Sequence, residues 1–231
     1  MSHASLMELL GLASPPIAIA FVDAPPPGVP AVAAGEPASC GYWRRAATET
    51  FFTVADDHKS CPIGAHTHNV PLTPQEQQEL MGLVGTMVGL SYLKMEEVPQ
   101  IPTRQTPLKV AVYSPLAAAP VPPDVVLVRG NARQLMLVVE ASQAAGVAGA
   151  GPAMGRPTCA VLPEAINSGR TAASFGCVGN RVYTGADDTE AYVAIPGAQL
   201  AAVEESLAVI VRANQALEAF HRARAASTPS S

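Results

Sequence analysis

Short runs of apolar residues alternate with turn-forming residues along this chain, which is the pattern of a sheet whose strands are separated by helices and loops. The runs that are rich in Val, Ile, Phe and Tyr end near Pro, Gly or Asp, as strands commonly do. They predict strands at residues 17–21, 50–54, 109–113, 125–128, 171–175 and 192–195. Helices are expected at residues 5–12, 39–47, 131–145, 164–167 and 198–223, and a further helix is expected to start at Thr73.

The helix that starts at Thr73 has the clearest first turn. Thr73 is followed by proline and then by Glu76, which is the arrangement of a capping box with proline at the first helical position. The segment also contains Gly82, Gly85 and Gly89. Each glycine weakens an isolated helix by about 1 kcal/mol, so we expect another element to pack closely there.

The C-terminal helix is the most regular amphipathic segment. Its apolar stripe consists of Leu200, Val203, Leu207, Ile210 and Leu217. The helix at 131–145 is expected to bury Leu135, Val138 and Val139. The last residues, 225–231, are polar and contain serine and proline, so they are predicted to form a disordered tail.

The order of elements predicts an α/β (or α+β) fold. Two parts of the sequence also resemble each other. Residues 16–21 are similar to residues 107–112, and each segment is followed by two cysteines with a glycine soon after the second. A true repeat requires an insertion, for which residues 123–150 are the natural candidate. We predict one domain over 1–224, built of two similar halves (about 5–100 and 101–224) packed with pseudo-two-fold symmetry; the alternative is a coincidental likeness.

Composition excludes several classes of function. Only 14% of the 231 residues are charged and the net charge is −5, so no basic surplus exists to bind nucleic acid or an anionic membrane. The longest apolar stretch, residues 110–128, is interrupted by prolines, so no transmembrane helix is expected. Residues 1–16 contain no Lys or Arg, which argues against a secretory signal. We expect a soluble, cytoplasmic protein.

The four cysteines form one pair in each half, Cys40 with Cys61 and Cys159 with Cys177. Ser39 is the expected cap of the helix at 39–47, which places Cys40 in its first turn, where the helix favours the thiolate form. Four thiolates suit either a 4Fe–4S cluster or tetrahedral zinc, although no compact Cys-x2-Cys pattern occurs. We predict that both pairs meet at one centre and bind a 4Fe–4S cluster, with zinc as the alternative.

Residues near the second cysteine of each pair are candidates for contact with the cofactor. Gly64 and Gly179 would let backbone N–H groups approach and donate to cluster sulfurs. Asn180 and Arg181 are expected at the same site, with Arg181 as a fork-shaped donor to an anionic ligand. Two further polar residues stand close in sequence to the second cysteine pair, namely Glu164 and Asn167. For these polar residues the alternative is helix capping and loop hydrogen bonding.

Other roles for the cysteines remain open. One alternative is that some of them are small buried apolar residues, as free cysteines often are, whereas disulfides are less expected in a cytosolic chain. Cys61 lies near three histidines in sequence, which suits a nucleophile with a histidine base or a mixed metal site, unless these histidines are simply solvated. The histidines are His58, His66 and His68. Cys177 is the other candidate nucleophile. No phosphate loop, dinucleotide fingerprint, nucleophile elbow or metalloprotease motif is present, so no catalytic residue is assigned.

Four blocks of the sequence resemble a known family. The chain is similar to the bacterial and archaeal family catalogued as domain of unknown function 169, over about residues 5–220. The likeness is carried by residues 158–169, 176–181, 59–62 and 15–18. Three of the cysteines lie in these blocks and Cys40 lies outside them. The resemblance implies no reaction, but it favours cysteines that act together.

The sequence therefore predicts an iron–sulfur protein for electron transfer, for sensing, or for presenting its cluster to a small ligand. A redox partner or a small molecule would be its partner. A cysteine-dependent enzyme and a zinc-stabilised small-molecule binding module are the alternatives. The oligomeric state is left open.

Overall fold

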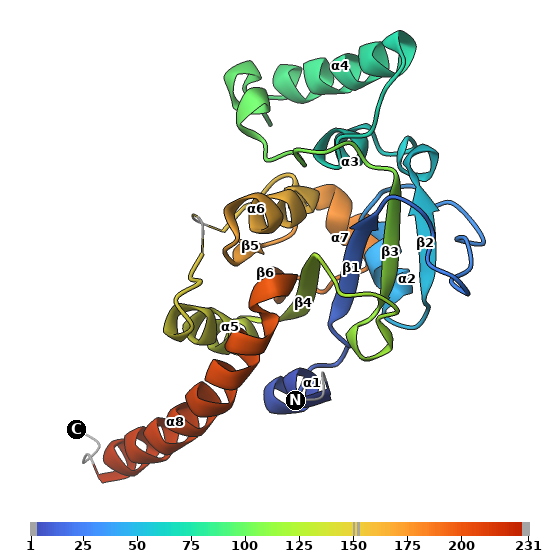
Figure 1. Ribbon diagram of the computed structural model, residues 1–231. Coiled ribbons are helices and arrows are strands. Elements are labelled where there is room, and N and C mark those ends of the chain that lie inside the picture. The colour runs from blue at the N-terminus through green and yellow to red at the C-terminus, as the bar shows by residue number, and fades with distance from the viewer. Residues whose placement is uncertain (1–3, 150, 152, 228–231) are drawn as a thin grey trace.

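A single six-stranded sheet crosses the molecule, with helices on both of its faces (Figure 1). The computed structural model describes residues 4–149, 151 and 153–227. Its strands are β1 (Ile17–Val22), β2 (Phe51–Val54), β3 (Val110–Pro115), β4 (Val125–Asn131), β5 (Ala172–Ser174) and β6 (Glu190–Pro196). Its helices are α1 (Ala4–Leu10), α2 (Gly41–Ala46), α3 (Pro62–Thr67), α4 (Pro74–Gly89), α5 (Ala132–Ala144), α6 (Val161–Ser168), α7 (Val178–Thr184) and α8 (Leu200–Ser227). Short 3-10 helices are η1 (Ala55–His58), η2 (Met95–Gln100), η3 (Leu116–Ala118), η4 (Thr158–Ala160) and η5 (Gly197–Gln199).

The strands follow the order β2-β3-β1-β4-β6-β5, and every neighbouring pair is antiparallel. At the centre Ile17 of β1 lies opposite Leu127 of β4, and on its other side it lies opposite Pro115 of β3. The mixed helix–strand fold and the long C-terminal helix are confirmed. Because the sheet is antiparallel, the α+β description fits better than a parallel α/β fold.

The strand order bears on the predicted repeat. In chain order, β1, β2 and β3 occupy one side of the sheet, and β4, β5 and β6 occupy mirrored places on the other side. This order relates β1 to β4, whereas the sequence likeness related residues 16–21 to residues 107–112, which lead into β3, the hydrogen-bonded neighbour of β1. The pseudo-two-fold symmetry is not confirmed and stays a prediction.

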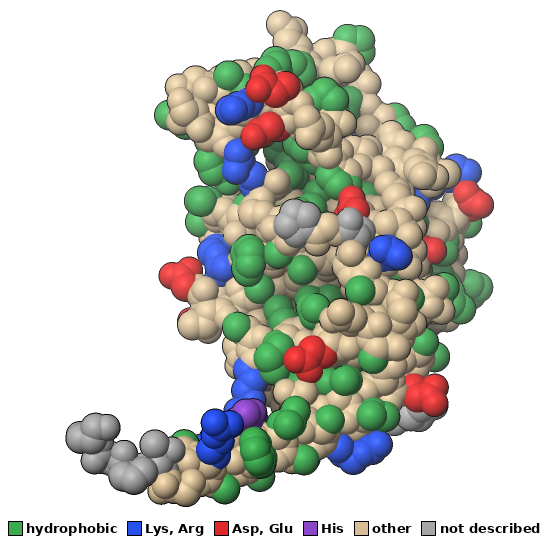
Figure 2. Space-filling view, turned by 90° about the vertical axis from the view of Figure 1, so that its left-hand side faces the viewer, with side chains coloured by type: hydrophobic (Ala, Val, Ile, Leu, Met, Phe, Trp, Pro, Cys, Tyr) green, Lys and Arg blue, Asp and Glu red, His purple; other side chains and the backbone are tan. Residues whose placement is uncertain are grey.

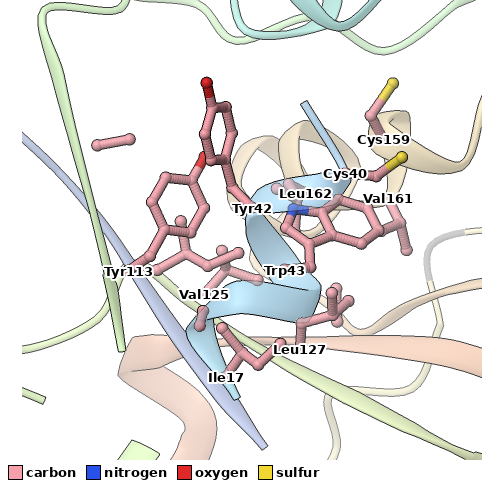
Figure 3. Close-up of a cluster of buried hydrophobic side chains, with 14 of the residues drawn as sticks. Ile17, Cys40, Tyr42, Trp43, Tyr113, Val125, Leu127, Cys159, Val161 and Leu162 are labelled. Carbon is pink, nitrogen blue, oxygen red and sulfur yellow. The ribbon is translucent and has the colours of Figure 1, made fainter. Parts of the chain in front are cut away.

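Alternating side chains of the strands supply two separate cores. On one face Ile17 and Leu127 pack with Trp43 of α2 and Leu162 of α6, and this core reaches Cys40 and Cys159 (Figure 3). On the other face the strands pack against α1, α5 and α8. Residues one step apart on a strand point to opposite faces, which explains why short apolar runs lie between two layers of helices.

Helix α4 lies apart from the sheet, above α3 (Figure 1). Its capping box is confirmed, because Thr73 Oγ1 accepts from the backbone N–H of Glu76 and the Glu76 carboxylate accepts from the Thr73 N–H. The expected close packing at its three glycines is wrong. No described atom lies within 4 Å of a Cβ placed at those positions. The helix instead packs through Leu80 and Val84, which form a small cluster with Leu93.

Two predictions about the outer helices need correction. Val139 of α5 is 43% exposed, because only Leu135 and Val138 of the predicted set face the core. Leu217 of α8 is 55% exposed, since this helix continues past the edge of the sheet (Figure 1). Helix α8 runs to Ser227, so residues 225–227 of the predicted tail are helical, and residues 228–231 lie outside the described part.

Among the residues that the structure describes, none of the helices combines the length and the apolar character that a bilayer crossing requires.

Candidate functional site

All four cysteines of the chain line one pocket of about 500 Å³. Each comes from a different segment on the same face of the sheet. Cys40 precedes α2, Cys159 lies in η4 before α6, and Cys61 and Cys177 are the N-cap residues of α3 and α7. All four cysteines, Cys40 included, therefore lie on the wall of the same pocket.

Cys61 and Cys177 are held in the same way. Both have extended backbones, and each sulfur accepts a hydrogen bond from the backbone N–H three residues later. Gly64 N lies 3.3 Å from Cys61 Sγ, and Asn180 N lies 3.4 Å from Cys177 Sγ. These bonds satisfy N–H groups that the first turn of a helix leaves without a partner. Neither helix was predicted from the sequence, although the cysteines themselves serve as caps.

Cys40 and Cys159 lie deeper in the protein. Burial raises the pKa of Cys40 to about 12, and burial also raises the pKa of Cys159. The other cysteines are close enough to contribute to both increases. Near neutral pH both thiols are therefore protonated. Figure 3 shows their sulfur atoms pointing to the same side, above the Trp43 ring.

Ser39 does not cap α2, contrary to the prediction. The N-cap residue is Cys40, and no side chain forms a cap bond there. The Ser39 hydroxyl instead lies 3.0 Å from His58 Nδ1, and Ser39 is 1% exposed. Gly64 is pressed against this serine, since a Cβ built on Gly64 would lie 2.1 Å from Ser39 Oγ. Gly64 thus allows α3 to approach the start of α2 closely, while it is not itself on the pocket wall.

Asn180 and Gly179 do lie on the pocket wall. Asn180 is 1% exposed, and neither polar atom of its amide has a hydrogen-bond partner of normal geometry in the described residues. The amide is nevertheless near enough to the Cys40 thiol to lower its pKa, against the larger effect of burial. The amide of Asn180 therefore lies among polar atoms at the pocket wall, next to Cys40 and Tyr192.

The thiols do not form a ready-made metal site. All four cysteines are free, and within the described ranges no three side chains of His, Cys, Asp or Glu are arranged to hold a metal ion. The cysteines share a pocket, but as they stand their sulfurs do not converge on a single ion.

The histidines near Cys61 are buried or partly buried, and the expectation that they are solvated is wrong. His58 and His68 are almost completely buried, and their rings stack with centroids 4.9 Å apart. His58 Nε2 lies 2.9 Å from Thr53 Oγ1, and His68 Nδ1 lies 2.8 Å from the Gly64 carbonyl oxygen. Neither these two nor His66 lies on the pocket wall, so their placement offers no base for Cys61.

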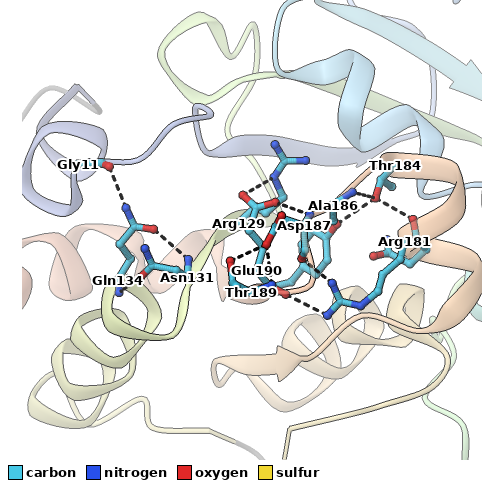
Figure 4. A network of polar contacts seen from close by, with 12 residues as sticks. Gly11, Arg129, Asn131, Gln134, Arg181, Thr184, Ala186, Asp187, Thr189 and Glu190 are labelled. Atoms are coloured by element: carbon cyan, nitrogen blue, oxygen red, sulfur yellow. Dashed lines mark hydrogen bonds and ion pairs between the residues drawn. The ribbon is translucent and has the colours of Figure 1, made fainter.

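Arg181 has a structural role in place of the expected one (Figure 4). Its guanidinium donates to the carbonyl oxygens of Phe175, Asp187 and Glu190, and it is not on the pocket wall. These bonds hold α7 to the segment that leads into β6. The assignment of Arg181 to an anionic ligand is therefore corrected.

Glu164 and Asn167 are also outside the pocket wall. Asn167 Nδ2 donates to the Thr103 carbonyl oxygen at 2.9 Å, which is the loop hydrogen bonding that the sequence analysis named as the alternative. Both residues belong to α6, and no residue of this helix lines the pocket.

The opposite wall of the pocket was not foreseen. It comes from α4 and the segment after it, which we call the lid and define by Leu83, Met87, Tyr92, Leu93 and Ile101. Arg156 also lines the pocket, and its guanidinium lies over the ring of Tyr92. No local pattern marks these residues, because apolar side chains on a helix look alike whether they face a core or a pocket.

We expect the protein to lose stability as the pH falls from about 6.5 toward 4. Burial lowers the pKa of His68 from 6.5 to about 4 and lowers the pKa of His58 well below 6.5. The unfolded chain therefore binds protons that the folded chain resists, so this contribution is complete above pH 6.5 and is lost toward pH 4. His68 alone accounts for roughly 2–3 kcal/mol.

Urea unfolding near pH 7 and near pH 4.5 measures this difference. His68→Gln should flatten the pH dependence, and His221→Gln, at an exposed position on α8, should keep it. Equal unfolding free energies at the two pH values in the unsubstituted protein would contradict the prediction.

Comparison with known proteins identifies one family. The model of the family described as "DUF169: Uncharacterised ArCR" matches residues 5–206. No curated protein and no solved structure matches the chain. The matched range includes all four cysteines and ends within α8, somewhat before the end of the likeness expected from sequence.

Proposed function

Since the chain belongs to the uncharacterised DUF169 family, we propose its function from the site alone: the protein binds one 4Fe–4S cluster through Cys40, Cys61, Cys159 and Cys177. The cluster would serve electron transfer, sensing, or contact with a small ligand. When bound, such a group supplies one-electron chemistry whose potential depends on its surroundings.

The observation that carries the proposal is the gathering of every cysteine in the chain at one pocket. The four cysteines come from four segments far apart in sequence. Free cysteines that only fill space are scattered through a core wherever a small apolar residue fits. Four thiols facing one pocket are instead the donor set of an iron–sulfur cluster or of zinc.

The surroundings of the sulfurs support the same proposal. Two backbone N–H groups already donate to Cys61 and Cys177, and the Asn180 amide lies beside the Cys40 thiol. Hydrogen bonds to sulfur stabilise the negative charge of bound thiolates and set the reduction potential of a cluster. In the folded protein the bonds at Cys61 and Cys177 are in place before any cofactor binds.

Size favours a cluster over a single zinc ion. Zinc draws its four sulfurs to about 2.3 Å from one centre. A cubane cluster has an iron at each of four corners, so its thiolates stand farther apart. A pocket of about 500 Å³ also exceeds the space that one ion requires.

Cluster binding must remove protons from the buried thiols. The raised pKa values of Cys40 and Cys159 mean that both thiols are neutral in the folded protein without a cofactor. Only deprotonated thiols bind metal, so binding releases these protons and is opposed by low pH.

Anaerobic purification with iron and sulfide analysis tests the proposal. We expect a brown protein with about four iron and four sulfide ions per chain. Alanine in place of any one of the four cysteines should strongly reduce iron and the broad visible absorbance. Ser60→Ala is the matched control, because Ser60 lines the same pocket but donates to the Glu36 carbonyl oxygen. Trp43, the single tryptophan, lies beside Cys40 (Figure 3). Its fluorescence should therefore be quenched when the cluster binds.

Two results would overturn the proposal. A colourless protein with one bound zinc would establish the structural metal site instead. A protein without metal, in which one cysteine reacts with an alkylating reagent and three are inert, would favour a nucleophile.

A further inference from the structure

We propose that the same pocket also binds a small apolar monocarboxylic acid, held between the four cysteines and the lid. This inference rests on the proposed function in one respect: the cluster would occupy only the cysteine side of the pocket.

The pocket has room for both occupants. The eight inorganic atoms of a cubane cluster, at about 30 Å³ each (the share of a water molecule in the liquid), fill roughly half of the 500 Å³. What remains suits a molecule of about eight non-hydrogen atoms on the same basis. Figure 2 shows the face of the molecule that lies on the left in Figure 1. This face has a hollow below its uppermost part, and hydrophobic side chains lie in the hollow.

The lid gives the remaining space an apolar wall. Leu83 and Met87 come from one side of α4, and Leu93 belongs to the cluster that joins α4 to Ile63 of α3. Apolar side chains exclude water from a ligand and contribute about 25 cal/mol for each Å² of apolar surface that they bury. An occupant of this wall is therefore largely hydrocarbon.

Arg156 determines the polar group of the ligand. It is the one charged side chain on the wall within the described residues. Its guanidinium lies 5.0 Å from the centre of the Tyr92 ring, and its Nη2 donates to Glu97 Oε2 at 3.1 Å. Both members of this ion pair are about 40% exposed, so the pair contributes little. A guanidinium has five N–H donors and can bind a carboxylate with two parallel bonds.

These features together define the class of ligand. One cation facing an apolar space matches one negative charge on an apolar molecule, and a second charge on the ligand would have no partner on this wall. A bound carboxylate would lie next to the cysteine side, where it could alter the surroundings of the cluster.

Hexanoate, with eight non-hydrogen atoms, is the probe, and hexan-1-ol and hexylamine are its matched controls. Calorimetric titration of the purified protein, with its iron content measured on the same sample, should show hexanoate binding about tenfold more tightly than hexan-1-ol, because hydrogen bonds between charged groups are stronger than those of a neutral hydroxyl. Hexylamine should bind least. Arg156→Gln should remove the preference for hexanoate over hexan-1-ol.

Substitutions in the lid provide an independent test. Leu83→Trp fills the pocket and should abolish hexanoate binding while leaving the iron content unchanged. Met81→Trp places the same side chain on the exposed side of the same helix and should leave binding intact. Met87→Trp is the second filling variant, and circular dichroism confirms that each variant is folded.

The outcomes separate this inference from the proposed function. Iron-containing protein that binds hexylamine as well as hexanoate, or that binds hexanoate equally with and without Leu83→Trp, would overturn the inference and leave the cluster intact. Iron-free protein that binds hexanoate with the expected preference would support the ligand site and count against the cluster. A change in the visible spectrum on adding hexanoate would support both.

Discussion

Replacing Gly64 with alanine is expected to abolish the proposed cluster binding and to destabilise the fold. The new Cβ would lie 2.1 Å from Ser39 Oγ, 2.7 Å from Ser39 Cβ and 3.1 Å from Cys61 Sγ. Ser39 is buried and its hydroxyl is hydrogen-bonded to His58, so it has little freedom to move away. The first turn of α3 must shift instead, and Cys61 shifts with it. Overpacking of this kind costs about 1–3 kcal/mol.

Iron content and urea unfolding measure the two effects of Gly64→Ala. Gly85→Ala is the control, because a Cβ at this position would have no neighbouring atom within 4 Å and Gly85 is not on the pocket wall. Ser39→Gly combined with Gly64→Ala removes the obstacle and should recover part of the iron. If Gly64→Ala retained full iron and stability, the close approach of α2 and α3 described above would be wrong.

Trp43→Ala is expected to cost about 3–5 kcal/mol of unfolding free energy, the range for deletion of a large buried aromatic side chain. Trp43 is 1% exposed and meets the ring of Tyr192 on β6 edge-on, with centroids 5.6 Å apart. It thereby fixes α2, and with it Cys40, on the sheet. Loss of the indole should loosen the position of this cysteine and lower iron content as well.

Trp43→Phe distinguishes packing from hydrogen bonding. The indole N–H has no hydrogen-bond partner in the described residues, so phenylalanine loses only part of the contact area and no bond. Urea unfolding followed by circular dichroism should rank the unsubstituted protein first, Trp43→Phe next and Trp43→Ala last. Equal unfolding free energies for Trp43→Phe and Trp43→Ala would show that the aromatic ring at this position does not stabilise the fold.

The strands were predictable because their apolar residues follow a simple period. Ile17 and Ile19 face one core and Ala18 faces the other. A strand that is covered on both sides is therefore a continuous run of apolar residues, which is visible in the sequence. The pairing of strands was not predictable in the same way. It depends on contacts between β1 and β4, which local patterns do not encode.

The candidate site was only partly visible in the sequence. The four cysteines form two pairs with similar separations in the sequence, and this pattern suggested that they act together. The structure places all four at one pocket. Helices α3 and α7 were missed, because six or seven residues are too few to show helical periodicity. The role of Arg181 was misjudged, since its partners are backbone carbonyl groups, and any residue can supply those.

The distribution of the four cysteines over the chain has a consequence for biosynthesis. The ribosome completes β1, β2 and the first two thiols long before η4 and α7 exist. A nascent chain at that stage offers half of a ligand set, with no opposing wall to close around a metal. Under the proposed chemistry, cofactor loading is therefore a late event that requires a nearly complete polypeptide, and premature termination before residue 177 leaves a product that cannot mature.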